Sequence, residues 1–232
     1  MTLQPEPQAA VHPAAAYYPG AEGGAPAKDL TALGVLAFVT AAVATLCTCV
    51  TAGVIGRATR VRAEDGINAF DWSLPVYYVG TFLGLLSLVL GWVTGSMWLH
   101  RARTNAEALA PGSRHTWSAG WAWGAWVTPV VAAWFPFQVV RDVRRALTPA
   151  ASTALIGCWW ALFLATEIGW YASFNLQGNA LVHVENAAAA RQMSVITAAV
   201  MVAALAAWAE VLRVVTVEQH ERMYGRAGQD PS

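Results

Sequence analysis

The pattern of hydrophobic and polar positions divides the chain into five apolar segments separated by short polar stretches. Each segment reaches the roughly 20 residues that a helix needs to cross the hydrocarbon core of a bilayer. A helix covering a soluble core would show a polar face with a period of 3.6 residues, and the first two segments show none. Backbone groups in lipid must be paired within a helix, so we predict an all-α, polytopic membrane helix bundle. The segments run over about 30–56, 72–99, 116–140, 153–174 and 193–215.

The two ends of the chain are predicted to be tails. Residues 1–29 are rich in Pro, Ala and Gly, and such a segment buries too little apolar surface to offset the entropy of ordering. The basic start of a signal peptide is missing, because the first cation is Lys28. We therefore expect a disordered tail over 1–29, a transmembrane domain over 30–222 and a short flexible tail over 223–232.

Composition supports a membrane protein. Apolar residues make up 56% of the chain and charged residues only 12%, against about 25% charged in soluble domains. The net charge of zero gives no basic surface for nucleic acid. The cations are thirteen Arg and one Lys, and with so much Ala and Val they indicate a GC-rich, bacterial coding genome. Several of the twelve Trp lie at segment ends, as expected at a membrane interface.

The number of membrane crossings has two interpretations. The third apolar segment, 116–140, has no charge over 25 residues, which favours a span, but Pro129 and Pro136 interrupt it. With five spans, nine Arg against five cations would place the N-terminus outside. With four spans and a re-entrant third segment, ten cations against four would place both termini inside. We prefer five spans and keep four as the alternative.

Small residues form one narrow face of the second segment. Their spacing of four, three, four and four positions places them in line on a helix. Small side chains let helices approach closely in lipid, so we expect an internal packing seam, with a homodimer face as the alternative. The seam consists of Gly80, Gly84, Ser87, Gly91 and Gly95.

Two further features carry charge. Glu167 lies inside the fourth segment, and an ionisable group at membrane depth is a candidate functional site, unless it is hydrated near the headgroups or paired with an Arg.

After Pro136, aliphatic residues share one face of a short helix and Arg141 and Arg145 lie on another. This pattern predicts a helix in the interface with its Arg near anionic lipid headgroups; the alternative is an ordinary helix extension.

The sequence shows no pattern of catalysis or cofactor binding. The histidines all lie in tails, loops or segment ends, which argues against haem inside the bundle. Cys47 and Cys49 would point about 200° apart on a helix, so they cannot hold one metal ion together. Nucleotide-binding, serine-hydrolase and zinc-protease motifs are missing. We expect a protein that is not an enzyme and has no cofactor.

Several motifs resemble a known family. They are the stretch WLHRARTNAEAL over 98–109, a Trp/Pro/Gln block over 117–142, the pair Trp159–Trp160, and QHER at 219–222. Together they are similar to a bacterial, mainly actinobacterial, membrane family called domain of unknown function 4328. The resemblance implies a multi-helix bundle in the plasma membrane and makes the block its functional or folding centre. The candidate residues are Arg101, Arg103, Asn105, Pro129, Trp134, Pro136, Gln138, Arg141 and Asp142.

The block departs from the family pattern at two positions. The family often has an Asn three residues after the first proline and a basic residue before the second. Here these positions hold Ala132 and Phe135. If that Asn supplies a polar contact at the helix break, this chain lacks it.

Two classes of function remain. The first is a non-catalytic membrane protein that binds a partner protein, a second copy of itself or a lipid, including an anionic lipid. The second is a small-solute transporter or channel that uses Glu167 and the proline-broken third segment. A water-filled cavity that reaches Glu167 would favour transport, whereas a dry, tightly packed bundle would favour binding.

Overall fold

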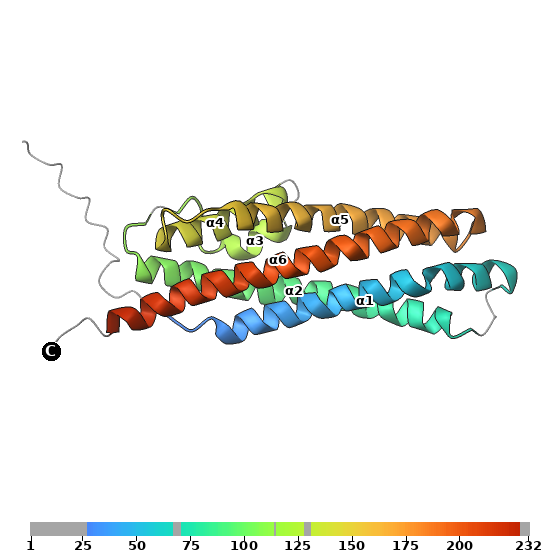
Figure 1. Ribbon diagram of the computed structural model, residues 1–232, viewed down its shortest axis with the longest axis horizontal. Coiled ribbons are helices and arrows are strands. Elements are labelled where there is room, and N and C mark those ends of the chain that lie inside the picture. Colours follow the sequence, from blue (N-terminus) through green and yellow to red (C-terminus); the bar gives the residue numbers. More distant parts are fainter. Residues whose placement is uncertain (1–26, 67–70, 114, 128–130, 228–232) are drawn as a thin grey trace, which may run out of the picture.

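Four long helices lie side by side in an elongated bundle (Figure 1). The computed structural model describes residues 27–66, 71–113, 115–127 and 131–227, so most of the predicted tail over 1–29 lies outside the described residues. The described part contains helices and turns and no strand. The long helices are α1 (Thr31–Glu64), α2 (Ser73–Leu109), α5 (Ala154–Ala180) and α6 (Ala187–Ala227).

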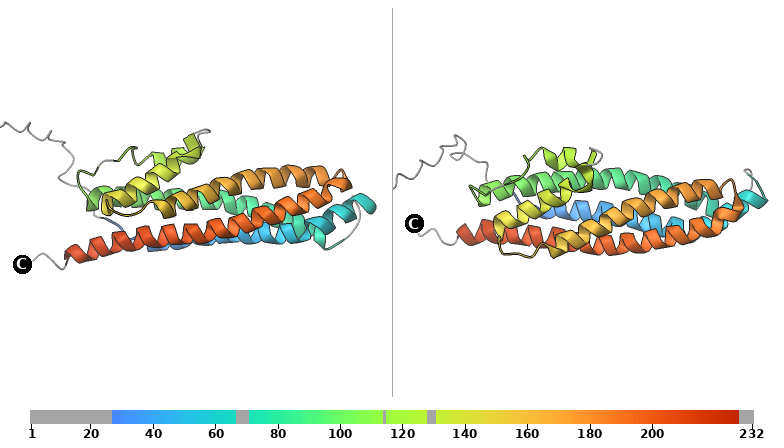
Figure 2. Two further views of the ribbon diagram at one scale, coloured as in Figure 1. Left: turned by 45° about the horizontal axis from the view of Figure 1, so that its top comes forward. Right: turned by 90° about the horizontal axis from the view of Figure 1, so that it is seen from above.

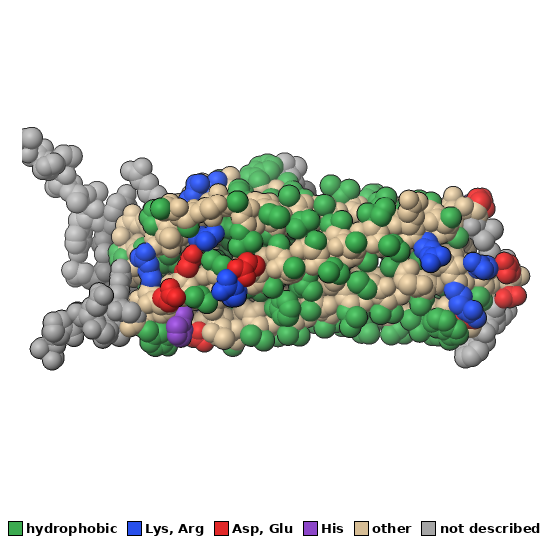
Figure 3. All heavy atoms as spheres, viewed as in Figure 1, with side chains coloured by type: hydrophobic (Ala, Val, Ile, Leu, Met, Phe, Trp, Pro, Cys, Tyr) green, Lys and Arg blue, Asp and Glu red, His purple; other side chains and the backbone are tan. Residues whose placement is uncertain are grey.

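The long helices have the composition and surface of membrane spans. All four are long and apolar enough to cross a bilayer, counting only described residues. Large apolar side chains point outward, and Leu46, Phe82 and Ile168 are each more than 60% exposed. On the face shown in Figure 3, apolar side chains and backbone cover the middle of the bundle, whereas Arg, Asp and Glu side chains gather towards its two ends. Such a surface is stable in hydrocarbon and not in water, so the chain is a multi-pass membrane protein.

The third apolar segment does not form one long helix. It is divided between α3 (Trp121–Val127), a 3-10 turn at Val131–Ala133 and the start of α4 (Phe135–Leu147). A proline has no N–H to donate and restricts the residue before it, which explains the new helix start next to Pro136.

The connection between α2 and α5 returns to the end of the bundle that it left. The last turn of α2 and the first turn of α5 lie at the same end in every view (Figures 1 and 2). Within the described residues, α3 and α4 pack against α2. The structure therefore favours four spans with a folded third segment, and it does not support our preference for five.

The aliphatic face of α4 is buried against protein. Val139, Val140, Val143 and Leu147 are at most 3% exposed, and α4 contacts α2, α5 and α6. The helix that we expected to lie in the membrane interface thus turns its apolar face into the bundle. Arg144 on this helix is also paired, since its Nε lies 3.2 Å from Glu218 Oε1, whereas Arg145 is exposed.

The small-residue seam of α2 lies partly against α1. A Cβ atom added at Gly80 would lie 2.9 Å from Thr51 Cγ2, and one at Gly84 would lie 3.5 Å from Cys47 Cβ. At Gly95 such an atom would meet nothing within 4 Å among the described residues. The seam therefore packs closely on α1 near the start of α2 and opens farther along.

Candidate functional site

Buried amides join three elements at the end of the bundle where residues 27–29 and the last turns of α6 meet. The Asn105 amide nitrogen donates to the Lys28 carbonyl at 2.6 Å and to Gln219 Oε1 at 2.8 Å. In return, the Lys28 backbone N–H donates to Asn105 Oδ1 at 2.9 Å. Gln219 is fully buried and donates to the Ala102 carbonyl at 2.8 Å. We call Lys28, Ala102, Asn105 and Gln219 the terminal clasp, and this end of the bundle the terminal end.

Other residues of the predicted Arg101–Asp142 block also bond to one another. The buried Arg103 side chain donates to the Trp117 carbonyl at 3.1 Å. The Trp117 indole N–H donates to Gln138 Oε1 at 2.8 Å, and the Thr116 N–H donates to Asp142 Oδ2 at 3.2 Å. These contacts tie the chain between α2 and α3 to α4; that the block is the functional or folding centre stays a prediction.

The remaining block residues lie around this network. The Arg101 guanidinium donates to the Asp29 carbonyl at 3.4 Å, and Arg141 pairs with Asp142 at 3.1 Å. Pro136 is buried, whereas Trp134 is exposed. Pro129 lies outside the described residues.

His115 lies within this network and outside the long helices. Its Nε2 and the Ser113 hydroxyl are 2.9 Å apart, whereas its Nδ1 is buried with no hydrogen-bond partner among the described residues. Burial lowers the pKa of His115 from its ordinary value of 6.5, and the nearby Arg103 charge lowers it further. The neutral imidazole is therefore favoured in the folded protein.

Glu167 lies at the middle of α5. The helix continues beyond the predicted segment to Ala180, which places Glu167 thirteen residues from either end, or about 20 Å along the axis. The placement near the headgroups that we kept as an alternative stays a prediction. The side chain of Glu167 is exposed.

A large cavity lies between the long helices at the level of Glu167. Its volume is about 660 Å³, and residues of α1, α2, α5, α6 and the 3-10 turn line it. Most of the lining is aliphatic or aromatic, and Glu167 is the ionisable side chain in the described lining. The cavity reaches the bundle surface, where Val89 and Glu167 are exposed. Its aromatic and polar lining includes Trp92, Trp159, Phe163, Trp208, Thr166 and Glu167.

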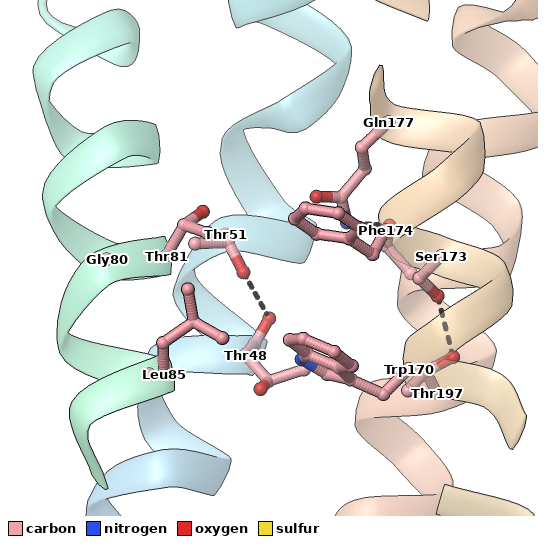
Figure 4. Close-up of a pocket in the computed structure, with 12 residues that line it drawn as sticks. Thr48, Thr51, Gly80, Thr81, Leu85, Trp170, Ser173, Phe174, Gln177 and Thr197 are labelled. Carbon is pink, nitrogen blue, oxygen red and sulfur yellow. Dashed lines mark hydrogen bonds between the residues drawn. The ribbon is translucent and has the colours of Figure 1, made fainter. Parts of the chain in front are cut away.

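A second, smaller space lies among hydroxyl and amide side chains (Figure 4). Its volume is about 30 Å³, enough for a water molecule. The Ser173 and Thr197 hydroxyl oxygens are 2.8 Å apart. The Gln177 amide donates to Ser194 Oγ at 2.8 Å and accepts from the Tyr77 hydroxyl at 3.1 Å. We call this space the hydroxyl chamber.

The hydroxyl chamber and the large cavity are stacked along the bundle axis. On each long helix, a chamber residue lies three or four positions, or one turn, from a cavity residue. Sequence reasoning missed this arrangement because each polar residue stands alone within an apolar segment. The chamber and cavity pairs are Thr48 and Thr45, Gly84 and Ser87, Trp170 and Glu167, and Thr197 and Met201.

These features define a class, the multi-pass membrane helix bundles, here with a central apolar cavity and a folded third segment. The family model described as Domain of unknown function (DUF4328) matches residues 60–217, and the chain belongs to this family. The resemblance noted in the sequence is thus confirmed. No curated protein and no solved structure matches the chain. The matched range includes Asn105 of the terminal clasp and ends shortly before its partner Gln219.

Proposed function

We propose that the chain is a non-catalytic protein of the bacterial plasma membrane that binds a lipid-like ligand in its central cavity. The cavity supports this proposal because its volume of about 660 Å³ falls in the range of small-molecule sites, about 300–1,000 Å³. Its lining is largely apolar, which suits a molecule dissolved in the bilayer. The opening at the bundle surface gives such a molecule a route from lipid.

Native mass spectrometry of the full chain, extracted gently from its own membrane, tests the proposal. We expect a bound small molecule of defined mass and stoichiometry. Ala204 lines the cavity, so Ala204→Phe should remove the bound mass by filling the space. Ala206 lies on the same helix with its side chain exposed, so Ala206→Phe is the matched control and should keep it. An unliganded wild type, or an equal bound mass in Ala204→Phe, would contradict the proposal.

A second candidate is a small-solute transporter, which one observation favours. The hydroxyl chamber continues the cavity by one turn on all four long helices, so polar groups follow one another from Glu167 towards the end of α5. Transport through this route requires Glu167, and Glu167→Gln should abolish flux in reconstituted vesicles. Unchanged flux in the variant would remove Glu167 from the mechanism.

A further inference from the structure

The charge of the central cavity comes from one carboxylate. Glu167 lies in a largely apolar lining, and no Arg, Lys or His lines the cavity among the described residues. A carboxylate at membrane depth is costly without a positive partner. The cavity is therefore complementary in charge to a cation that the described part of the chain does not itself supply.

Aromatic rings gather around the same space. Trp92 of α2, Trp159 and Phe163 of α5 and Trp208 of α6 all line the cavity, and the rings of Trp159 and Trp208 stack with centroids 4.8 Å apart. The faces of aromatic rings attract cations, most strongly where water is excluded. Aromatic walls and a single carboxylate together are the chemistry of an organic-cation site.

A buried hydroxyl adds a polar group beside the carboxylate. Thr166 precedes Glu167 and lines the cavity, and it is only 7% exposed. Its oxygen has no hydrogen-bond partner among the described residues. The oxygen is itself closed off from the cavity, so it contributes a dipole beside the carboxylate and no direct contact with a ligand.

We propose that the cavity binds a monovalent organic cation whose charge is shielded by apolar groups. The charge lies beside Glu167 and the apolar groups lie against the Trp and Phe rings. This inference rests on the proposed binding function and names the ligand class. The desolvation free energy of a compact, strongly hydrated ammonium at this depth is large, whereas that of a dispersed charge is smaller. The amines of phospholipid headgroups are not the ligand proposed here, because they stay at the interface, about 15 Å from the bilayer midplane.

Two probes of one shape test the inference: tetraphenylphosphonium and neutral tetraphenylmethane. Binding is measured to the full chain in nanodiscs of zwitterionic lipid, with empty nanodiscs subtracting simple partition. We expect saturable binding of the cation, weakened at least tenfold by Glu167→Gln and largely retained by Glu167→Asp. Tetraphenylmethane should bind equally to wild type and Glu167→Gln, which also shows that this variant is folded.

The cavity variants separate failure of this inference from failure of the proposed function. The proposed binding function and the cation inference are both supported by the following results. Ala204→Phe blocks binding of the cation and Ala206→Phe does not, and Glu167→Gln weakens binding of the cation but not of the neutral probe. If Ala204→Phe blocks cation and neutral probe alike and Glu167→Gln changes neither, the cavity binds apolar ligands and the cation inference is overturned. If Ala204→Phe changes the binding of no probe, the cavity is not a ligand site and both are overturned.

Discussion

Gly169 shows how one missing side chain allows two helices to approach. A Cβ atom there would lie 2.8 Å from Thr197 Oγ1, and the Thr197 hydroxyl is held by Ser173 and by the Met193 carbonyl. We expect Gly169→Ala to destabilise the bundle by about 1–3 kcal/mol through overpacking. The measurement is thermal unfolding in detergent. Gly157→Ala on the same helix meets no atom of the described residues within 4 Å and measures the gain in helix propensity alone. Equal melting temperatures of the two variants would contradict the packing argument.

His115 predicts a pH dependence at the residue scale. Because burial lowers its pKa in the folded state, the unfolded chain binds a proton more readily as the pH falls below about 6.5. The stability linked to neutral His115 is therefore present above that pH and lost as the pH falls through the lower, folded pKa. Arg103 opposes protonation, whereas Glu107 and Asp142 favour it. Melting temperatures between pH 7.5 and 5 should fall less in His115→Gln, and an equally steep fall would refute the assignment.

The sequence predicted the long helices better than their ends or the contacts between them. Long apolar runs predicted α1, α2, α5 and α6 because hydropathy reports span length directly. Helix ends were less visible: α1 continues through Arg57 to Glu64 and α6 to Ala227, so part of the predicted C-terminal tail over 223–232 is helical. Charged residues can extend a helix beyond the membrane, and hydropathy does not register them.

The path of the third segment and the contacts of the terminal clasp were not predicted, for different reasons. In the third segment, length argued for a span and the prolines argued for a break, and the two signals conflicted. In the clasp, Asn105 and Gln219 both belong to recognised motifs, but they are 114 positions apart. One sequence does not show that two such residues meet. The cavity escaped because it depends on how four helices diverge, which no local pattern encodes.

The terminal clasp makes a prediction at the element scale. Replacing Gln219 by Leu keeps the approximate volume but removes one of the two acceptors of the Asn105 amide nitrogen and the side-chain donor to the Ala102 carbonyl. Each lost hydrogen bond costs about 0.5–1.5 kcal/mol. Hydrogen exchange should therefore rise in the last turns of α2 and α6, and unchanged exchange there would show that the clasp contributes little. Gln192→Leu, at an exposed position of α6, is the control.

The whole molecule presents unequal charge at its two ends. The terminal end carries eight cations whose side chains are described and the opposite end four, so the positive-inside rule predicts that the terminal end faces the cytoplasm. A C-terminal fluorescent-protein fusion should fluoresce and an alkaline-phosphatase fusion at the same site should be inactive; the opposite pair of results would reverse the orientation. From their positions in the helices and connections, the cations are Lys28, Arg101, Arg103, Arg141, Arg144, Arg145, Arg213 and Arg222 at the terminal end, against Arg57, Arg60, Arg62 and Arg191 at the opposite end.

The opening of the cavity beside α5 decides how the concentration of the proposed ligand should be expressed. A molecule that enters past Val89 and Glu167 comes from the hydrocarbon, where an apolar compound is enriched by its partition coefficient. Occupancy then follows the mole fraction of ligand among lipids rather than its concentration in buffer. Washing the membrane would leave the ligand in place, and adding empty lipid would remove it by dilution in two dimensions.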